Sequence, residues 1–230
     1  MSKTRFDPQH ATRLVTVRSG LTRPGWTKQQ KVQIALLARD ASSSMAGEKA
    51  RDAEAASSGL VAALAAPENR DAFSVGVIDF ASDVRIAAPI TKATDLVNAM
   101  PALGASGHTN ITGALVEAKR LLGANAAMAG GGLPSVRPVV LLFSDGQHNV
   151  GDTPHAAAAA LKAEADVVTV AFGSDADETL LIAIATSPNH FYRCRDGKEL
   201  RKFFAAVGGT LSRSLANGVN AGAALATIRP

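Results

Sequence analysis

The feature that most constrains the fold is a regular alternation of short apolar runs with segments of helical periodicity. It begins at residue 32. The runs at residues 32–38 and 138–143 are apolar, short and closed by turn-forming residues, which is typical of buried strands. Residues 47–65 and 198–215 instead have the pattern of helices. Strands that alternate with helices form a mostly parallel sheet covered on both faces. The sequence therefore predicts an α/β three-layer sandwich.

The remaining elements are expected from the same patterns. Further strands are predicted at residues 73–80, 84–90, 166–172 and 191–194, and further helices at 94–100, 111–123, 177–186 and from Thr153-Pro154 onward. Thr94 is expected to cap its helix, and residues 81–83 to form a hairpin-like link. A loop is expected at residues 124–138, which contain three consecutive glycines and two prolines.

The first 31 residues differ in composition from the rest of the chain. They hold seven basic residues against Asp7 alone, and residues 12–18 are compatible with an edge strand. The basic charge suggests contact with nucleic acid or an acidic protein. Aromatic residues that could stack on bases are scarce there, which favours a solvated extension without nucleic-acid binding. We expect a basic extension at 1–31, one domain at 32–215 and a C-terminal tail at 216–230.

Composition disfavours several classes of protein. No apolar run approaches the about 20 residues of a membrane-spanning helix. The polar N-terminus has no apolar segment of the kind found in secretory signals. Cys194 is the single cysteine, so an intramolecular disulfide is impossible, and we expect it to be packed and inert. These observations favour a cytoplasmic protein.

Oxygen-bearing side chains alternate directly after the first strand, at Asp40, Ser42 and Ser44. Taken alone, this stretch also fits a serine-rich helix N-cap. Two later loops add Thr109, within residues 107–110, and Asp145, which follows the 138–143 strand. Ligands of parallel α/β sheets bind at the carboxyl ends of the strands, where these loops are expected to meet. Carboxylate and hydroxyl oxygens suit a hard divalent cation, with Mg²⁺ first and Mn²⁺ or Ca²⁺ as alternatives.

The set of motifs resembles the von Willebrand factor A domain with its metal-ion-dependent adhesion site. The resemblance covers about residues 32–215, including the order of the elements. It implies a Rossmann-like sheet of six strands with one antiparallel edge strand. It also implies that the hydroxyls of Ser42, Ser44 and Thr109 bind the metal. Asp40 and Asp145 would bind it directly or through water.

Two segments outside the metal motifs point to a subgroup. Residues 47–50 and 203–214 look like those of bacterial intracellular A domains associated with tellurium resistance and stress response. That resemblance implies that the protein functions together with other proteins of a stress-response system.

Two positions depart from the family pattern. Ser43 stands where the family has glycine, and it would be strained if the backbone there required a positive φ. Arg39 precedes the motif aspartate where an apolar residue is usual. Its cation either points away to solvent or pairs with Asp40, and the second arrangement would weaken metal binding.

We expect a binding module that is not an enzyme. A metal held largely by hydroxyls stays electrophilic, so its last ligand is expected to be an Asp or Glu carboxylate of a protein partner. Two alternatives remain. One is a metal-dependent hydrolase or phosphatase with His108 or His148 as the base, although no nucleophile–base pair is evident. The other is a nucleic-acid contact through the basic N-terminal extension.

Overall fold

The computed structural model describes residues 31–128 and 136–228. Residues 1–30, which include the expected edge strand at 12–18 and nearly all of the basic extension, lie outside the described residues. The described chain forms a six-stranded sheet in the order β3-β2-β1-β4-β5-β6. Its strands are β1 (Gln33–Asp40), β2 (Phe73–Phe80), β3 (Val84–Lys92), β4 (Val139–Ser144), β5 (Asp166–Phe172) and β6 (Phe191–Cys194). All neighbouring strands are parallel except β2 and β3, which confirms a mostly parallel sheet with one antiparallel edge strand.

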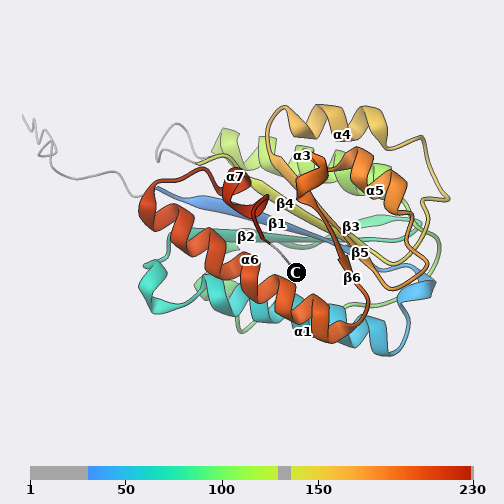
Figure 1. Ribbon diagram of the computed structural model, residues 1–230, viewed down its shortest axis with the longest axis horizontal. Helices are drawn as coiled ribbons and strands as arrows, with labels where there is room; N and C mark the ends of the chain where they lie inside the picture. Colours follow the sequence, from blue (N-terminus) through green and yellow to red (C-terminus); the bar gives the residue numbers. More distant parts are fainter. Residues whose placement is uncertain (1–30, 129–135, 229–230) are drawn as a thin grey trace, which may run out of the picture.

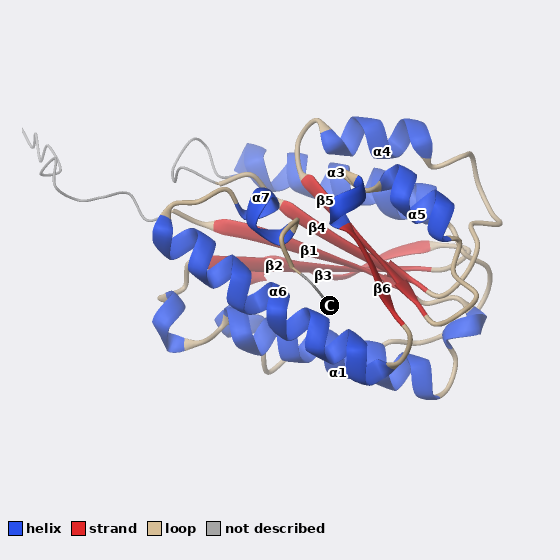
Figure 2. Ribbon diagram, viewed as in Figure 1, coloured by secondary structure: helices blue, strands red, loops and turns tan. Residues whose placement is uncertain are grey.

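Helices cover both faces of the sheet, as the alternating pattern predicts (Figures 1 and 2). One face packs against α1 and α6, and the other against α3, α4 and α5. The α-helices are α1 (Glu48–Leu64), α2 (Ala93–Leu96), α3 (Ile111–Met128), α4 (His155–Lys162), α5 (Glu178–Ile184), α6 (Gly197–Asn217) and α7 (Ala221–Leu225), and short 3₁₀ turns are η1 (Ser43–Met45), η2 (Pro67–Asn69) and η3 (Pro188–His190).

The central strands are buried on both faces, and their side chains divide into two apolar layers. In β1, Leu37 joins the layer beneath α1 and α6, whereas Leu36 joins the layer beneath α3 and α4. This division follows from the two-residue repeat of a strand. It explains why β1 and β4 appear in the sequence as nearly continuous apolar runs.

Three local expectations need correction: the loop at 124–138, the helix at 94–100 and its cap by Thr94. Helix α3 continues to Met128, so residues 124–128 are helical where a loop is expected. Helix α2 is only four residues long and starts at Ala93, before Thr94. The Thr94 hydroxyl donates to Asp71 at 3.1 Å instead of capping the helix. Within the expected C-terminal tail, α7 places Leu225 in the apolar layer with α6.

The sheet order defines where ligands are expected. Chain connections run from β1 to β2 on one side and onward to β4 on the other, so β1 lies at the point where the strand order reverses. β1 and β4 are neighbours, with Arg39 opposite Phe143. Asp40 and Ser144 therefore end adjacent strands at this switch point, where α/β sheets bind ligands.

Candidate metal centre

Asp40 is the last residue of β1, and its carboxylate is fully buried. Oδ1 accepts the backbone N–H of Ser42 at 2.8 Å, and Oδ2 accepts the hydroxyl of Ser144 at the end of β4. Burial raises the pKa of Asp40, and its hydrogen bonds with Ser144 and Ser42 oppose that rise. The negative charge of Asp145 raises the pKa further. Asp40 is thus a desolvated anion that a cation would stabilise.

The turn after β1 presents the two serine hydroxyls side by side. Ser42 Oγ and Ser44 Oγ lie 3.0 Å apart. The intervening η1 turn is anchored by Met45, whose side chain is fully buried. Among the described residues, Arg70 and Asp71 are the non-glycine residues with positive φ. Ser43 lies in the 3₁₀ turn with an ordinary φ, so serine fits where the family has glycine.

β4 delivers the second carboxylate. Asp145 follows the last strand residue, Ser144, and is fully buried. Its Oδ1 accepts the Ser44 hydroxyl at 2.7 Å, which links the loop after β4 to the loop after β1. The two loops are 101 residues apart in sequence. Their contact follows from the parallel pairing of β1 with β4.

Thr109 reaches the same place from the loop before α3. Its backbone exchanges hydrogen bonds with Asn149: the Thr109 N–H donates to Oδ1 at 2.9 Å, and the Asn149 N–H donates to the Thr109 carbonyl at 3.1 Å. The Ser43 N–H donates to the Gly107 carbonyl at 3.0 Å, which ties this loop to the first. A Cβ placed on Gly146 would lie 3.3 Å from Thr109 Oγ1 and 3.5 Å from Ser44 Oγ. Both hydroxyls therefore face Gly146.

Arg39 does not pair with Asp40. It is fully buried, and its Nε donates to Asp79 Oδ1 on β2 at 2.7 Å. Its Nη1 donates to the Pro101 carbonyl at 3.1 Å. Of the two arrangements considered for Arg39, neither solvent exposure nor competition for Asp40 is found, and the cation is held within the sheet.

These residues fit a divalent cation. A cavity of about 280 Å³ is lined by Ser42, Ser44, Thr109 and Asp145, together with His108, Asn149, Asp175 and neighbouring loop residues. Among the described residues, no group of three or more His, Cys, Asp or Glu side chains is arranged to hold a metal. A cation here would accordingly depend on hydroxyls as well as on the two carboxylates. Such all-oxygen donor sets suit Mg²⁺, Mn²⁺ or Ca²⁺.

Three residues of the site were missed from the sequence. Ser144 directly precedes Asp145 and Asn149 lies four residues after it, and each supports a ligand residue through a hydrogen bond. Lys49, near the start of α1, contacts Asp145 Oδ2 through its ammonium group. The position of Lys49 in the sequence does not indicate this contact, because it depends on how the first turn of α1 lies over the loop after β4.

The two histidines near the site have different environments. His148 Nδ1 accepts the N–H of Ile111 at 3.2 Å, and Nε2 lies 2.9 Å from the Asp152 carbonyl. Both ring nitrogens of His148 are thus engaged in hydrogen bonds, and neither is free for proton transfer. His148 therefore caps the start of α3 and supports the loop before it. His108, in contrast, is exposed and lines the cavity.

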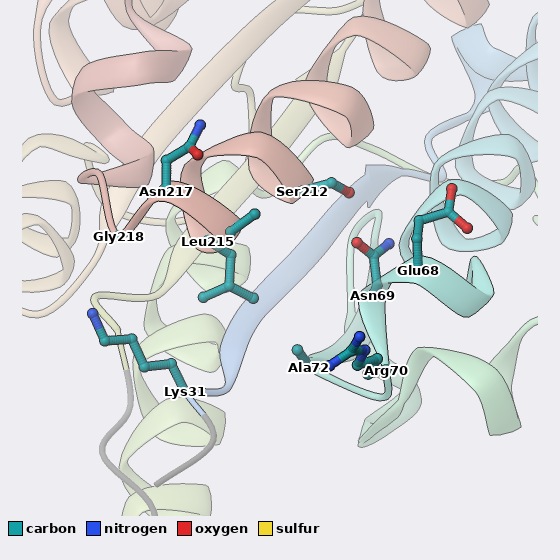
Figure 3. Close-up of a pocket in the computed structure, with 10 residues that line it drawn as sticks. Lys31, Glu68, Asn69, Arg70, Ala72, Ser212, Leu215, Asn217 and Gly218 are labelled. Carbon is teal, nitrogen blue, oxygen red and sulfur yellow. The ribbon is translucent and has the colours of Figure 1, made fainter. Parts of the chain in front are cut away.

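A larger cavity, of about 820 Å³, lies at the opposite edge of the sheet (Figure 3). Its lining comes from the chain just before β1 and β2 and from the last turns of α6, and includes Lys31, Arg70, Leu215 and Asn217. Glu68 is the one carboxylate of that lining. With one carboxylate, this lining is a poor cation site. The candidate cation site is therefore the cavity at the carboxyl ends of the strands.

Solved structures of other proteins share this fold. The structure of proximal thread matrix protein 1 from the mussel byssus is 25% identical, with a TM-score of 0.65 over 82% of this chain and 49% of that chain. The same mussel protein with a zinc-occupied metal-ion-dependent adhesion site gives 25% identity and a TM-score of 0.63, over 82% of this chain and 49% of that chain. The chain thus spans about half the length of the mussel protein.

A von Willebrand factor type A protein from Catenulispora acidiphila is 18% identical, with a TM-score of 0.64 over 78% of this chain and 42% of that chain, and shows the shared fold. No curated protein matches the sequence. The family model of the von Willebrand factor type A domain matches residues 36–206, which contain all five candidate ligands. The chain therefore belongs to the von Willebrand factor type A domain family.

Proposed function

We propose that the chain is a cation-dependent protein-binding module that captures an acidic side chain of a partner. The observation that carries this proposal is the union of two buried carboxylates, Asp40 and Asp145, with hydroxyls from two loops at one sheet edge. Domains of this family are typically metal-dependent interaction or adhesion modules. Bound Mg²⁺ would be held by Asp40, Ser42, Ser44, Thr109 and Asp145. It would supply an electrophile for a carboxylate.

The metal would be held mostly by neutral hydroxyls. Ser44 is exposed at the mouth of the cavity, whereas Ser42 and Thr109 are buried. An exogenous ligand would therefore approach from the Ser44 side. An Asp or Glu side chain matches a hard cation better than a neutral or sulfur-bearing group does. The partner's ligand is accordingly proposed to be a carboxylate.

The alternative of a hydrolase draws less support from the site. His148 uses both ring nitrogens in structural contacts. Ser42 and Ser44 bond to each other, and Ser44 donates to Asp145, so neither is paired with a histidine base. This arrangement lacks the nucleophile–base contact on which covalent catalysis depends.

The cellular setting is a further part of the proposal. We propose that the protein functions in the cytoplasm, within a bacterial stress-response or tellurium-resistance system. The single cysteine, Cys194, is buried, as expected for a protein that needs no disulfide. The subgroup rests on the resemblance of residues 47–50 and 203–214. No helix in the described part of the chain has the length and apolar character needed to cross a membrane.

The experiment that tests the proposal pairs a metal titration with partner capture. Calorimetry with Mn²⁺ should show one site in the natural protein and no binding in Asp145→Ala. Capture of partner proteins should require the divalent ion and be lost in the same variant. A flat titration of the natural protein would remove the basis of the proposal. Phosphatase or esterase turnover that disappears with Asp145→Ala would instead favour the hydrolase.

A further inference from the structure

Lys49 places a positive charge on one of the candidate metal ligands. It is the second residue of α1, and its ammonium contacts Asp145 Oδ2. The other oxygen, Oδ1, accepts the Ser44 hydroxyl at 2.7 Å. Asp145 is fully buried, whereas the Lys49 side chain is 34% exposed. The ammonium thus covers a buried carboxylate from the solvent side.

The ammonium changes the charge balance of the site. Asp40 and Asp145 together carry two negative charges, which a divalent cation would neutralise. With Lys49 included, the same residues carry one net negative charge without the cation and one net positive charge with it. The extra charge opposes a cation and favours an anion at the same position.

Two roles for Lys49 are compatible with its contact, and they make opposite demands. As a positioning residue it would hold Asp145 in place, and its loss would weaken metal binding. As a competing charge it would repel the metal, and its loss would strengthen binding. Asp145 is already fixed by burial at the end of β4 and by Ser44, so little positioning is left for Lys49. The repulsion between an ammonium and a divalent cation that share one carboxylate is the larger effect.

We propose that Lys49 weakens binding of the metal alone and couples it to binding of an acidic partner. A site with one excess positive charge holds the cation loosely until a carboxylate arrives. The partner's carboxylate and the metal then bind with positive cooperativity, each raising the affinity of the other. This inference rests on the proposed function, because it names how the same site selects its ligand.

The test uses the full chain, Mn²⁺ as probe and Lys49→Met as the variant. Methionine preserves the helix and most of the apolar stem but removes the charge. Calorimetry should show Mn²⁺ binding to Lys49→Met about tenfold more tightly than to the natural protein, since a neighbouring charge shifts an ionic equilibrium by about one order of magnitude or more. Lys31→Met makes the same substitution at the opposite edge of the sheet (Figure 3) and should leave Mn²⁺ affinity unchanged.

Acetate provides the second measurement. At equal ionic strength, replacing chloride with acetate should raise the Mn²⁺ affinity of the natural protein more than that of Lys49→Met. Thermal unfolding in a chelator verifies that both variants are folded.

The outcomes separate this inference from the proposed function. Weaker or equal Mn²⁺ binding by Lys49→Met, beside clear binding by the natural protein, overturns the role of Lys49 and leaves the metal site standing. Absence of binding in both proteins overturns the proposed function and this inference together. Binding by Lys49→Met alone, with no Mn²⁺ binding by the natural protein even in acetate, would overturn the proposed function and the coupling with it.

Discussion

Arg39 on β1 donates its Nε to Asp79 Oδ1 on β2 at 2.7 Å, and both side chains are buried in the sheet. The two residues are direct partners in the parallel register. Arg85 on β3 reaches the other oxygen of Asp79 at 2.7 Å. The Arg39 guanidinium therefore pairs with Asp79 of the neighbouring strand, and the Asp40 carboxylate remains available to a metal ion.

Asp79→Ala is expected to destabilise the protein strongly, because it leaves the Arg39 guanidinium buried without its anion. Loss of one member of a buried pair lowers the free energy of unfolding by about 3–5 kcal/mol. Urea unfolding of the purified proteins measures the difference. Arg85→Ala is the matched control, since Arg85 is 63% exposed and its ion pair should contribute about 0–1 kcal/mol. Equal effects of the two substitutions would contradict this account of the pair.

Gly146→Ala is expected to weaken Mn²⁺ binding while leaving the protein folded. The added methyl would lie 3.3 Å from Thr109 Oγ1, so this hydroxyl would have to shift by a few tenths of an ångström, whereas the 3.5 Å contact with Ser44 Oγ is an ordinary one. Calorimetry measures the affinity, and circular dichroism checks the fold. Gly104→Ala is the control, because a methyl there meets nothing within 4 Å. Mn²⁺ affinity unchanged by Gly146→Ala would argue against Thr109 as a ligand.

Asp40→Asn is expected to separate stability from metal binding. In a chelator at neutral pH, the variant should melt at or above the temperature of the natural protein, because it removes a buried charge. Addition of Mn²⁺ should raise the melting temperature of the natural protein only. Asp175→Asn, at an exposed carboxylate of the same cavity, should keep the response to Mn²⁺. A variant that still responds fully would exclude Asp40 as a ligand.

Cys194 is expected to resist alkylation in the folded protein. Burial raises the pKa of its thiol to about 12, and the charges of Glu199 and Asp196 add to the rise. The thiolate that reacts with iodoacetamide is therefore scarce until the chain unfolds. Labelling followed by mass spectrometry should be slow in buffer and fast in denaturant. Rapid labelling without denaturant would show that the β6 edge opens readily.

The same shift has a consequence for alkaline stability. The folded state retains the Cys194 proton above the pH at which an unfolded thiol, with an ordinary pKa near 9.0, releases it. The thiol's contribution to stability is complete below that pH and is lost as the pH rises through about 12. Cys194→Ser should reduce this part of the alkaline decline, which urea unfolding across the pH range measures.

The sequence by itself determined the layered α/β fold and the approximate positions of its strands and helices. Strand periodicity, turn residues and helix lengths are local properties, so they can be recognised without knowing what each element packs against. The motif at Asp40, Ser42 and Ser44 was equally local. Thr109 and Asp145 could be added because parallel strands end at one edge of the sheet. The extent of α3 was missed because the glycines and prolines of residues 130–138 favour a loop, whereas residues 124–128, just before them, contain no residue that ends a helix.

Only the tertiary structure decided which charges meet. Arg39 could have paired with its chain neighbour Asp40, and only the register of β1 against β2 gives it Asp79 instead. Lys49 could have pointed to solvent, and only the entry angle of α1 brings it to Asp145, 96 residues along the chain. Such contacts depend on how distant segments are oriented in space. Local sequence patterns do not encode that orientation. The orientation nevertheless decides which charged side chains surround the metal site.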